Sequence, residues 1–314
     1  MSPRRSAFID VGTNTILCVI AEIRDTGRFR VLADLAEIAR LGRGVDRTRR
    51  ISPDGVERGL AVLKRYRAQC ENLGVTEIVA VGTSALRDAE NSMEVCAGFR
   101  SELGFDIRVI SGEEEAAYSF LAVQCGLSLS GREILAIDIG GGSTELIYGN
   151  ESGFSRAVSL NLGSVRLTEK FLTSDPVRPD EVTRMNMMID AGLNSLPEQD
   201  LSPDRTLALV GIAGTFTTLA AMEKNLARYS HSEVHGSMLT IDAVTRQRKR
   251  LERKSIAERR QIAGLEPQRA DVIFAGACLV ERIMARYHAE RVIVSDHGVR
   301  YGLLHEAARA LQQC

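Results

Sequence analysis

The sequence predicts an α/β protein of two domains built to the same plan. Residues 8–23 and 134–148 share one pattern: an apolar strand, a glycine-containing turn and a second apolar strand. Each first strand carries an aspartate, and Asp138 follows Asp10 by 128 residues (138 − 10). A repeated supersecondary unit of this kind indicates two halves of similar construction. A chain of 314 residues is long enough for two hydrophobic cores.

The second hairpin has the composition of a phosphate-binding turn. Its glycines let the backbone adopt positive φ and let a ligand approach closely, and such a turn can aim several N–H groups at one anion. The turn residues are Gly140, Gly141, Gly142 and Ser143. Asp138 and Glu145 flank the turn with hard oxygens that suit Mg²⁺. The alternative is a glycine-rich hairpin with one structural aspartate, but a carboxylate in an apolar strand needs a partner.

Three further turns join the predicted phosphate site. Thr13 and Asn14 occupy the turn of the first hairpin. Gly214 and Thr215 follow an apolar strand and open an apolar helix, which predicts an anion site at a helix N-terminus. Gly163 and Ser164 lie at the start of another predicted helix and complete the set.

Hydrophobic periodicity and capping signals predict the remaining elements. In the first half we expect a strand over 29–41, a helix that Ser52-Pro53 opens and Gly74 ends, a strand over 77–81, a loop over 82–87, a helix over 91–103, a strand over 106–110 and a helix over 113–126. In the second half we expect strands over 133–139, 144–149, 154–161, 206–212 and 290–295, helices over about 164–172 and 180–195, a mostly helical stretch over 214–288 with a polar break at 229–236, and a terminal helix to about 312. The terminal helix is expected to pack on the first domain, which gives domains of 1–126 with 299–314, and 127–298.

One acidic helix start carries a candidate catalytic base. Ser111 and Glu114 have the spacing of a capping box, which explains Glu114 structurally. Glu115 is left to face a substrate, and the helix dipole is expected to keep it ionised. Arg87, near the end of the strand-to-helix loop, can donate two hydrogen bonds to phosphate oxygens. The alternative interpretation is that Arg87 forms a surface ion pair.

Composition excludes several other classes. The net charge of −1 gives no basic field for nucleic acid, and no apolar stretch or leader indicates a membrane or export, so we expect a cytoplasmic protein. Six scattered cysteines without a C-x-x-C pair indicate free thiols. The sequence holds no Walker motif or G-x-S-x-G elbow, and it assigns no role to His231, His235 or His297.

With these residues in view, the chain resembles the exopolyphosphatase/guanosine-pentaphosphate phosphohydrolase family, of the superfamily of actin, sugar kinases and heat-shock ATPases. The resemblance rests on F-I-D-V-G-T-N-T, V-G-T-S-A-L-R-D-A-E-N, V-I-S-G-E-E-E-A, A-I-D-I-G-G-G-S-T-E-L, L-N-L-G-S-V-R-L-T-E, V-H-G and V-S-D-H-G-V-R-Y-G-L-L. It implies two duplicated actin-like (ribonuclease H-like) domains with a cleft between them. It looks like the short, two-domain type, which implies that short polymers are favoured.

The resemblance also implies a reaction, the hydrolysis of a terminal phosphoanhydride with Mg²⁺, or Mn²⁺ as the alternative metal. Glu115 falls on the family's base, Asp138 and Glu145 on its metal-associated acids, and Arg87 on its phosphate-gripping arginine. The expected partner is inorganic polyphosphate or guanosine pentaphosphate, and the sequence leaves open whether the chain forms a homodimer. The rival functions are a small-molecule kinase of the same superfamily and a sensor that binds polyphosphate or an alarmone without turnover.

Overall fold

A computed structural model describes residues 4–196 and 207–312. The chain divides into two compact units: Met1–Ala122 with Gly298–Cys314 form unit 1, and Val123–His297 form unit 2. The chain therefore passes between the units twice, after Ala122 and after His297. Residue 206, which begins a predicted strand, and residues 1–3 and 313–314 of the predicted first domain lie outside the described residues.

Unit 1 is built on a mixed sheet of five strands in the order β3-β2-β1-β4-β5. The strands are β1 (Arg4–Val11), β2 (Thr15–Ile23), β3 (Phe29–Ile38), β4 (Glu77–Gly82) and β5 (Ile107–Val109). β1 pairs antiparallel with β2 and parallel with β4, so β1 lies at the centre. The helices are α1 (Val45–Thr48), α2 (Pro53–Asn72), α3 (Ser84–Asp88), α4 (Ser92–Leu103), α5 (Gly112–Gly126) and α13 (Val299–Gln312). The last turn of α5, from Val123 on, already belongs to unit 2.

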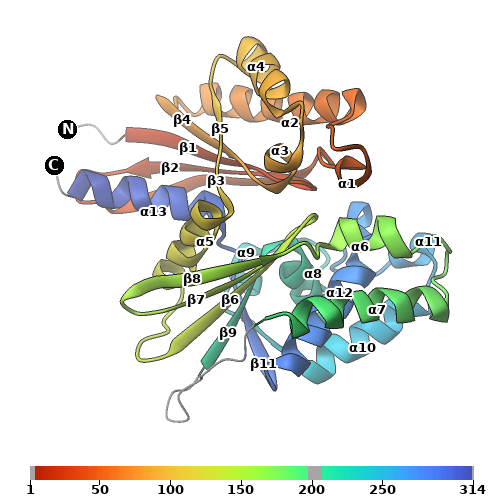
Figure 1. The fold of residues 1–314 in the computed structure, drawn as a ribbon. Helices are drawn as coiled ribbons and strands as arrows, with labels where there is room; N and C mark the ends of the chain where they lie inside the picture. The colour runs from red at the N-terminus through yellow and green to blue at the C-terminus, as the bar shows by residue number, and fades with distance from the viewer. Residues whose placement is uncertain (1–3, 197–206, 313–314) are drawn as a thin grey trace. The chain divides into compact units, whose positions relative to one another are not determined.

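Strand alternation divides the interior of unit 1 into two cores. Ile9 and Val11 of β1 face one core with α2 and α4, whereas Phe8 faces the other with α13. Figure 1 accordingly shows α2 and α4 on one side of this sheet and α13 along the other. Arg300 of α13 is 3% exposed and donates to both carboxylate oxygens of Asp34 on β3, at 2.9 and 3.1 Å. This buried bidentate pair fastens the terminal helix to the sheet.

Unit 2 repeats the arrangement with one strand more. Its order is β10-β11-β9-β6-β7-β8, from β6 (Glu133–Ile139), β7 (Thr144–Asn150), β8 (Gly153–Leu160), β9 (Leu207–Ile212), β10 (Met238–Thr240) and β11 (Arg291–Val294). The helices are α6 (Ser164–Phe171), α7 (Pro179–Asn194), α8 (Ala213–Glu223), α9 (His231–Val234), α10 (Ile241–Glu252), α11 (Ile256–Arg259) and α12 (Ile273–Arg286), with a 3₁₀ turn, Pro267–Arg269. Leu135, Ile137 and Ile139 of β6 face a single large core that includes α12.

The two sheets confirm the predicted α/β fold of two duplicated halves. In both, an antiparallel three-stranded meander precedes a parallel strand that pairs with its first strand. The hairpin registers also correspond, because Asp10 lies opposite Leu17 and Asp138 lies opposite Glu145. The second carboxylate is therefore particular to unit 2.

Most predicted boundaries agree with the structure within a few residues, and the exceptions are short elements. Ser52 caps α2 by accepting a hydrogen bond from the N–H of Gly55 at 3.1 Å, and Gly74 follows its end at φ +64°. The predicted loop 82–87 is wrong in part, because α3 forms there. The predicted helical stretch 214–288 is interrupted by β10 and by the turns between α11 and α12. Elements of three to five residues are too short to display a hydrophobic period.

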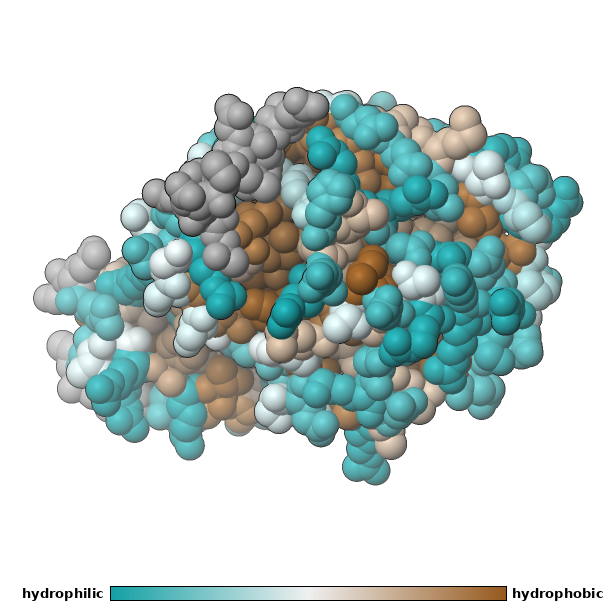
Figure 2. All heavy atoms as spheres, turned by 90° about the horizontal axis from the view of Figure 1, so that it is seen from below, coloured by the Kyte–Doolittle hydropathy of each residue, from teal (hydrophilic) through white to brown (hydrophobic). Residues whose placement is uncertain are grey.

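The face of the molecule drawn in Figure 2 is mostly hydrophilic, with apolar areas among the charged side chains. Such a mixture is normal for a folded protein, because polar groups cannot cover its whole surface. Within residues 4–196 and 207–312, no helix is both long enough and apolar enough to cross a membrane.

Candidate functional site

Backbone amides at the start of α6 donate hydrogen bonds to the carbonyl groups of the turn between β6 and β7. Gly140 closes the turn by donating its N–H to the carbonyl of Ser143 at 3.0 Å. The first amides of α6 then donate back to the turn, from Ser164 to the Gly140 carbonyl and from Val165 and Arg166 to the Gly141 carbonyl, each at 3.0 Å. These bonds use the N-terminal amides of α6 to fix the turn.

Gly163 permits this close packing. A Cβ atom at Gly163 would lie 2.2 Å from the carbonyl oxygen of Gly141, so no other residue fits without moving the backbone. The Arg166 Nε atom donates to the Gly142 carbonyl at 2.7 Å, and burial lowers the pKa of this guanidinium. Gly163 and Ser164, which we predicted as phosphate contacts, thus lie where they position the turn.

The opposite side of the same turn presents N–H groups. Among the residues that the structure describes, the amides of Gly141 and Gly142 donate to no protein acceptor. Because the carbonyls of a peptide turn point away from its amides, fixing the carbonyls on α6 also fixes the direction of these N–H groups. The arrangement is that of an anion-binding nest.

The turn between β1 and β2 is held in the same way. Gly12 donates its N–H to the Thr15 carbonyl at 3.2 Å. The carbonyl of Thr13 accepts from the amide of Gly42 at 2.9 Å, and that of Asn14 accepts from Ala39 at 3.0 Å and from the next residue at 2.9 Å. Within the described chain, the amides of Thr13 and Asn14 likewise donate to no protein acceptor.

Two carboxylates face each other across the β6–β7 ladder. Asp138 and Glu145 are register partners, which places their Cβ atoms roughly 5 Å apart on one face of the sheet. That face is opposite to the core, because their neighbours Ile137 and Ile139 point into the core. Glu145 is only 2% exposed, and the Ser159 hydroxyl donates to its Oε1 at 2.9 Å. Two carboxylates directly opposite each other repel unless other groups offset their charges.

Glu115 and Arg87 meet within unit 1 although the sequence separates them widely. Arg87 Nη1 donates to Glu115 Oε2 at 2.9 Å and to the Ile110 carbonyl at 3.1 Å. Burial raises the pKa of the Glu115 carboxyl, the Arg87 guanidinium opposes this rise, and Asp88 adds to it. The prediction that the helix dipole keeps Glu115 ionised therefore leaves out the largest influence, which is desolvation and favours the protonated form.

The other acids of the same turn have separate explanations. Ser111 and Glu114 form the predicted capping box, with bonds of 2.9 and 3.1 Å between each backbone N–H and the other side chain. These bonds, together with Arg108, lower the pKa of Glu114. Glu113 is exposed. Of the three glutamates, only Glu115 is held by Arg87.

The third glycine turn contains a cation that sequence analysis missed. A Cβ atom at Gly214 would lie 2.1 Å from Arg269 Nη1, so the guanidinium packs directly on the first turn of α8. Ala213, at φ +67°, adopts a left-handed conformation that is uncommon outside glycine. Thr215 is buried and donates to the Ile139 carbonyl at 3.5 Å. Arg269 lies in a short 3₁₀ turn, and nothing in the local sequence marks it.

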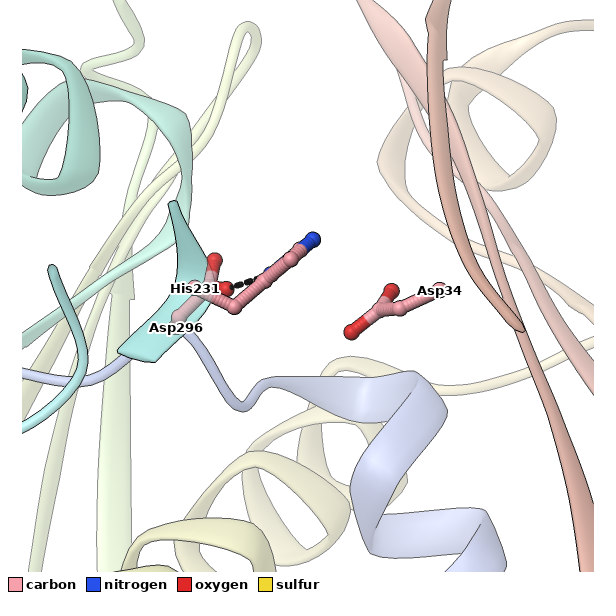
Figure 3. A group of neighbouring side chains, drawn as sticks. All are labelled: Asp34, His231 and Asp296. Carbon is pink, nitrogen blue, oxygen red and sulfur yellow. Dashed lines mark hydrogen bonds and ion pairs between the residues drawn. The ribbon is translucent and has the colours of Figure 1, made fainter. Parts of the chain in front are cut away.

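A histidine–carboxylate pair lies at the carboxyl end of β11 in the same unit. His231 Nδ1 bonds to Asp296 Oδ2, as Figure 3 shows, and the Tyr229 hydroxyl donates to Asp296 Oδ1 at 2.7 Å. The other nitrogen of His231 points away from the carboxylate (Figure 3). Asp34, also drawn there, belongs to unit 1, where Arg300 and Tyr301 bind it.

The carboxyl ends of three parallel strands collect these groups in unit 2. β6, β9 and β11 run parallel, and each ends at one of the features described: the Gly140 turn, the Gly214 turn and Asp296. Ligands of open α/β sheets bind beyond this edge. Fold and site together define a duplicated α/β protein with glycine turns fixed in both units and, in unit 1, a buried carboxylate held by a guanidinium.

The comparisons with known proteins narrow this class. The chain belongs to the Ppx/GppA phosphatase family, whose family pattern matches residues 19–310. It is 33% identical to exopolyphosphatase 2 of Mycobacterium tuberculosis, over 96% of this chain and 98% of that protein. It is 32% identical to a bifunctional 3-dehydroquinate synthase/phosphatase of Fusobacterium nucleatum, covering 96% of this chain but only 46% of that longer protein.

A solved structure extends the similarity to three dimensions. The crystal structure of an exopolyphosphatase from Cytophaga hutchinsonii superimposes with a TM-score of 0.90 at 30% identity, over 98% of each chain. The family predicted from the motifs is therefore confirmed, and so is the fold class.

Proposed function

We propose that the protein is an exopolyphosphatase, which hydrolyses the terminal phosphoanhydride of inorganic polyphosphate and favours short chains. The observation that carries the proposal is the Arg87–Glu115 pair, a buried carboxylate of raised pKa held 2.9 Å from a guanidinium. A general base is most effective when its pKa lies near the working pH, so burial suits Glu115 to this role. The relatives named exopolyphosphatase support polyphosphate as the substrate class.

The proposed phosphate contacts are amides, hydroxyls and the Arg87 guanidinium, with the Arg269 guanidinium beside them. The fixed turns of both units supply N–H groups, Arg87 supplies the cation, and Arg269 adds a second cation beside the third turn. The full proposed set is Thr13, Asn14, Arg87, Gly140, Gly141, Gly142, Ser143, Gly163, Ser164, Gly214 and Thr215. Gly163 and Ser164 serve indirectly in this set, because their contacts hold the turn.

Asp138 and Glu145 fit a divalent cation, since two carboxylates opposed across a ladder offer hard oxygens and gain from charge neutralisation. Magnesium, or manganese in its place, would supply neutralisation of the charge on the phosphate chain. Ser159 holds one Glu145 oxygen, which orients that carboxylate.

In the proposed reaction, water attacks the terminal phosphorus. The water oxygen forms a bond to phosphorus as the bond from phosphorus to the bridging oxygen breaks. The shortened chain departs with the bridging oxygen, and the attacked phosphoryl group becomes orthophosphate. Glu115 orients the water and accepts its proton, while Arg87 shifts from Glu115 towards the phosphate oxygens. Losing this partner makes Glu115 more basic at the moment when a base is needed.

Guanosine pentaphosphate presents the same terminal group and is the second candidate substrate. The deciding experiment measures phosphate release with Mg²⁺ from short polyphosphate, long polyphosphate, guanosine pentaphosphate and ATP. Release from short polyphosphate that is lost in Glu115→Ala supports the proposal, and release from the guanosine substrate alone moves the activity to alarmone hydrolysis. Binding without release supports a sensor, and ATP consumption that needs an acceptor supports a kinase.

A homodimer and a cytoplasmic location complete the proposal. Size-exclusion chromatography with light scattering tests the first, and fractionation of the source cells tests the second.

A further inference from the structure

One histidine of unit 2 lies beside both places where the chain passes between the units. His235 directly follows the short helix α9 and precedes Gly236, whose φ of +77° turns the chain. Gly236 donates its N–H to the Val294 carbonyl, and Val294 donates to the Ser237 carbonyl, each at 2.8 Å. These bonds fix the backbone of His235 against the end of β11.

The imidazole of His235 uses both ring nitrogens. Its Nδ1 accepts a hydrogen bond from the backbone N–H of Asp296 at 3.2 Å, and its Nε2 lies 3.0 Å from the carbonyl oxygen of Gly126. An amide N–H is only a donor and a carbonyl oxygen is only an acceptor. The pair of contacts therefore specifies the neutral tautomer with its proton on Nε2.

Packing reinforces the two hydrogen bonds. The rings of His235 and His297 stack with centroids 4.0 Å apart and an interplanar angle of 23°. A Cβ atom at Gly126 would lie 2.8 Å from His297 Nδ1 and 3.3 Å from His235 Cε1. The last position of α5 must therefore be glycine for the two rings to reach its backbone.

These contacts join the two segments at which the chain passes between the units. Gly126 follows the first passage of the chain between the units, and Asp296 and His297 directly precede the second. α5, which ends at Gly126, carries Glu115 in its first turn. One imidazole thus binds the end of the helix that bears the proposed base and the segment that leads into α13.

We propose that His235 is a positioning residue, which ties the two chain passages together and thereby fixes α5 and Glu115. The catalytic consequence rests on the proposed function, whereas the tie itself does not. The hydrogen bonds and the ring contact of His235 involve Gly126, Asp296 and His297, none of which is a proposed phosphate contact. Its loss should therefore lower kcat by at least about tenfold and leave KM nearly unchanged. Displacing a catalytic group by about 1 Å already has large effects on the rate.

The test uses the full chain with matched variants. His235→Ala removes both bonds, and Gly126→Ala inserts a methyl group against the same rings, so both should lower kcat. His235→Gln retains an amide acceptor and donor and should recover most of the activity. His288→Ala, at an exposed histidine of the same unit, and Gly98→Ala, where a Cβ atom meets nothing within 4 Å, should behave as the unchanged protein.

Two measurements are independent of any substrate. Nitrogen-15 NMR of the histidine rings should show one imidazole with bare Nδ1 and protonated Nε2 that disappears in His235→Ala. Hydrogen exchange of the Asp296 amide should accelerate in the same variant. If both signatures appear and polyphosphate is not hydrolysed, the proposed function fails while the tie stands.

Other outcomes overturn the proposal. A protonated Nδ1 on His235 in the folded protein would contradict the tie directly. Equal kcat in His235→Ala and the unchanged protein would exclude the positioning role. If His235→Ala does not fold, Gly126→Ala and His235→Gln decide, and loss of activity in Gly126→Ala through KM alone would also count against it.

Discussion

Replacing Glu115 by glutamine separates catalysis from stability. The change keeps the shape of a side chain that is 12% exposed and its hydrogen-bonding distance to Arg87, but it removes the base. General bases contribute about 10² to 10⁴ in rate, which corresponds to roughly 3 to 5 kcal/mol of transition-state stabilisation. We therefore expect Glu115→Gln to lose phosphate release by at least about a hundredfold.

The stability of Glu115→Gln should be equal to or higher than that of the unchanged protein, although its activity falls. Because burial raises the pKa of Glu115, the folded protein binds a proton more readily than the unfolded chain, and the ionised carboxylate opposes folding at neutral pH. Glutamine carries no such charge, so thermal melting at pH 7 should show an unchanged or higher midpoint. The acidic limb of the activity profile of the unchanged protein should also lie above the ordinary glutamate value of 4.5.

The control is Glu113→Gln, in the same helical turn but exposed. It should retain full phosphate release. Activity of Glu115→Gln within about threefold of the unchanged protein would refute the assignment of the base. An equal loss in Glu113→Gln would show that the helix start as a whole is needed, and not this carboxylate.

Three further predictions concern the metal, the turn and acid stability. In EDTA, Glu145→Gln should have a melting temperature no lower than that of the unchanged protein, because the substitution relieves repulsion with the cross-strand partner Asp138. The variant should also lose most of the rise in melting temperature that Mg²⁺ gives, and an undiminished rise would exclude this metal site. Gly163→Ala should reduce phosphate release more than tenfold and lower the free energy of unfolding by about 2 kcal/mol, because the added methyl group meets the Gly141 backbone. Gly98→Ala, measured in the same activity and urea-unfolding assays, should change neither quantity. Burial lowers the pKa of His305 to about 4, so the unfolded chain binds a proton first on acidification, and the free energy of unfolding should fall between about pH 6.5 and 4 by at most about 3 kcal/mol. His305→Leu should flatten that part of the unfolding curve, and an unchanged slope would contradict the argument.

Local chemistry explains why the sequence predicted most of the fold. Strand–turn–strand composition, helix caps and glycine ends act over a few residues, so the hairpins, α2 and the capping box of α5 were all predictable. The duplication was visible because Asp10 and Asp138 both follow isoleucine and both precede a β-branched residue and then glycine. Short elements were missed for the corresponding reason, since β10 and α3 offer too few residues for a pattern.

Contacts between distant segments were decided by tertiary structure. Nothing near Arg269 predicts that it packs on Gly214, because the approach depends on how a 3₁₀ turn crosses the start of α8. The raised pKa of Glu115 follows from its burial, which outweighs the opposing effect of Arg87, and no sequence spacing encodes either influence. The tautomer of His235 likewise depends on an amide and a carbonyl from two remote segments. The sequence by itself determined which groups could act on phosphate, whereas the packing of separate elements determined the charge, direction and partners of each.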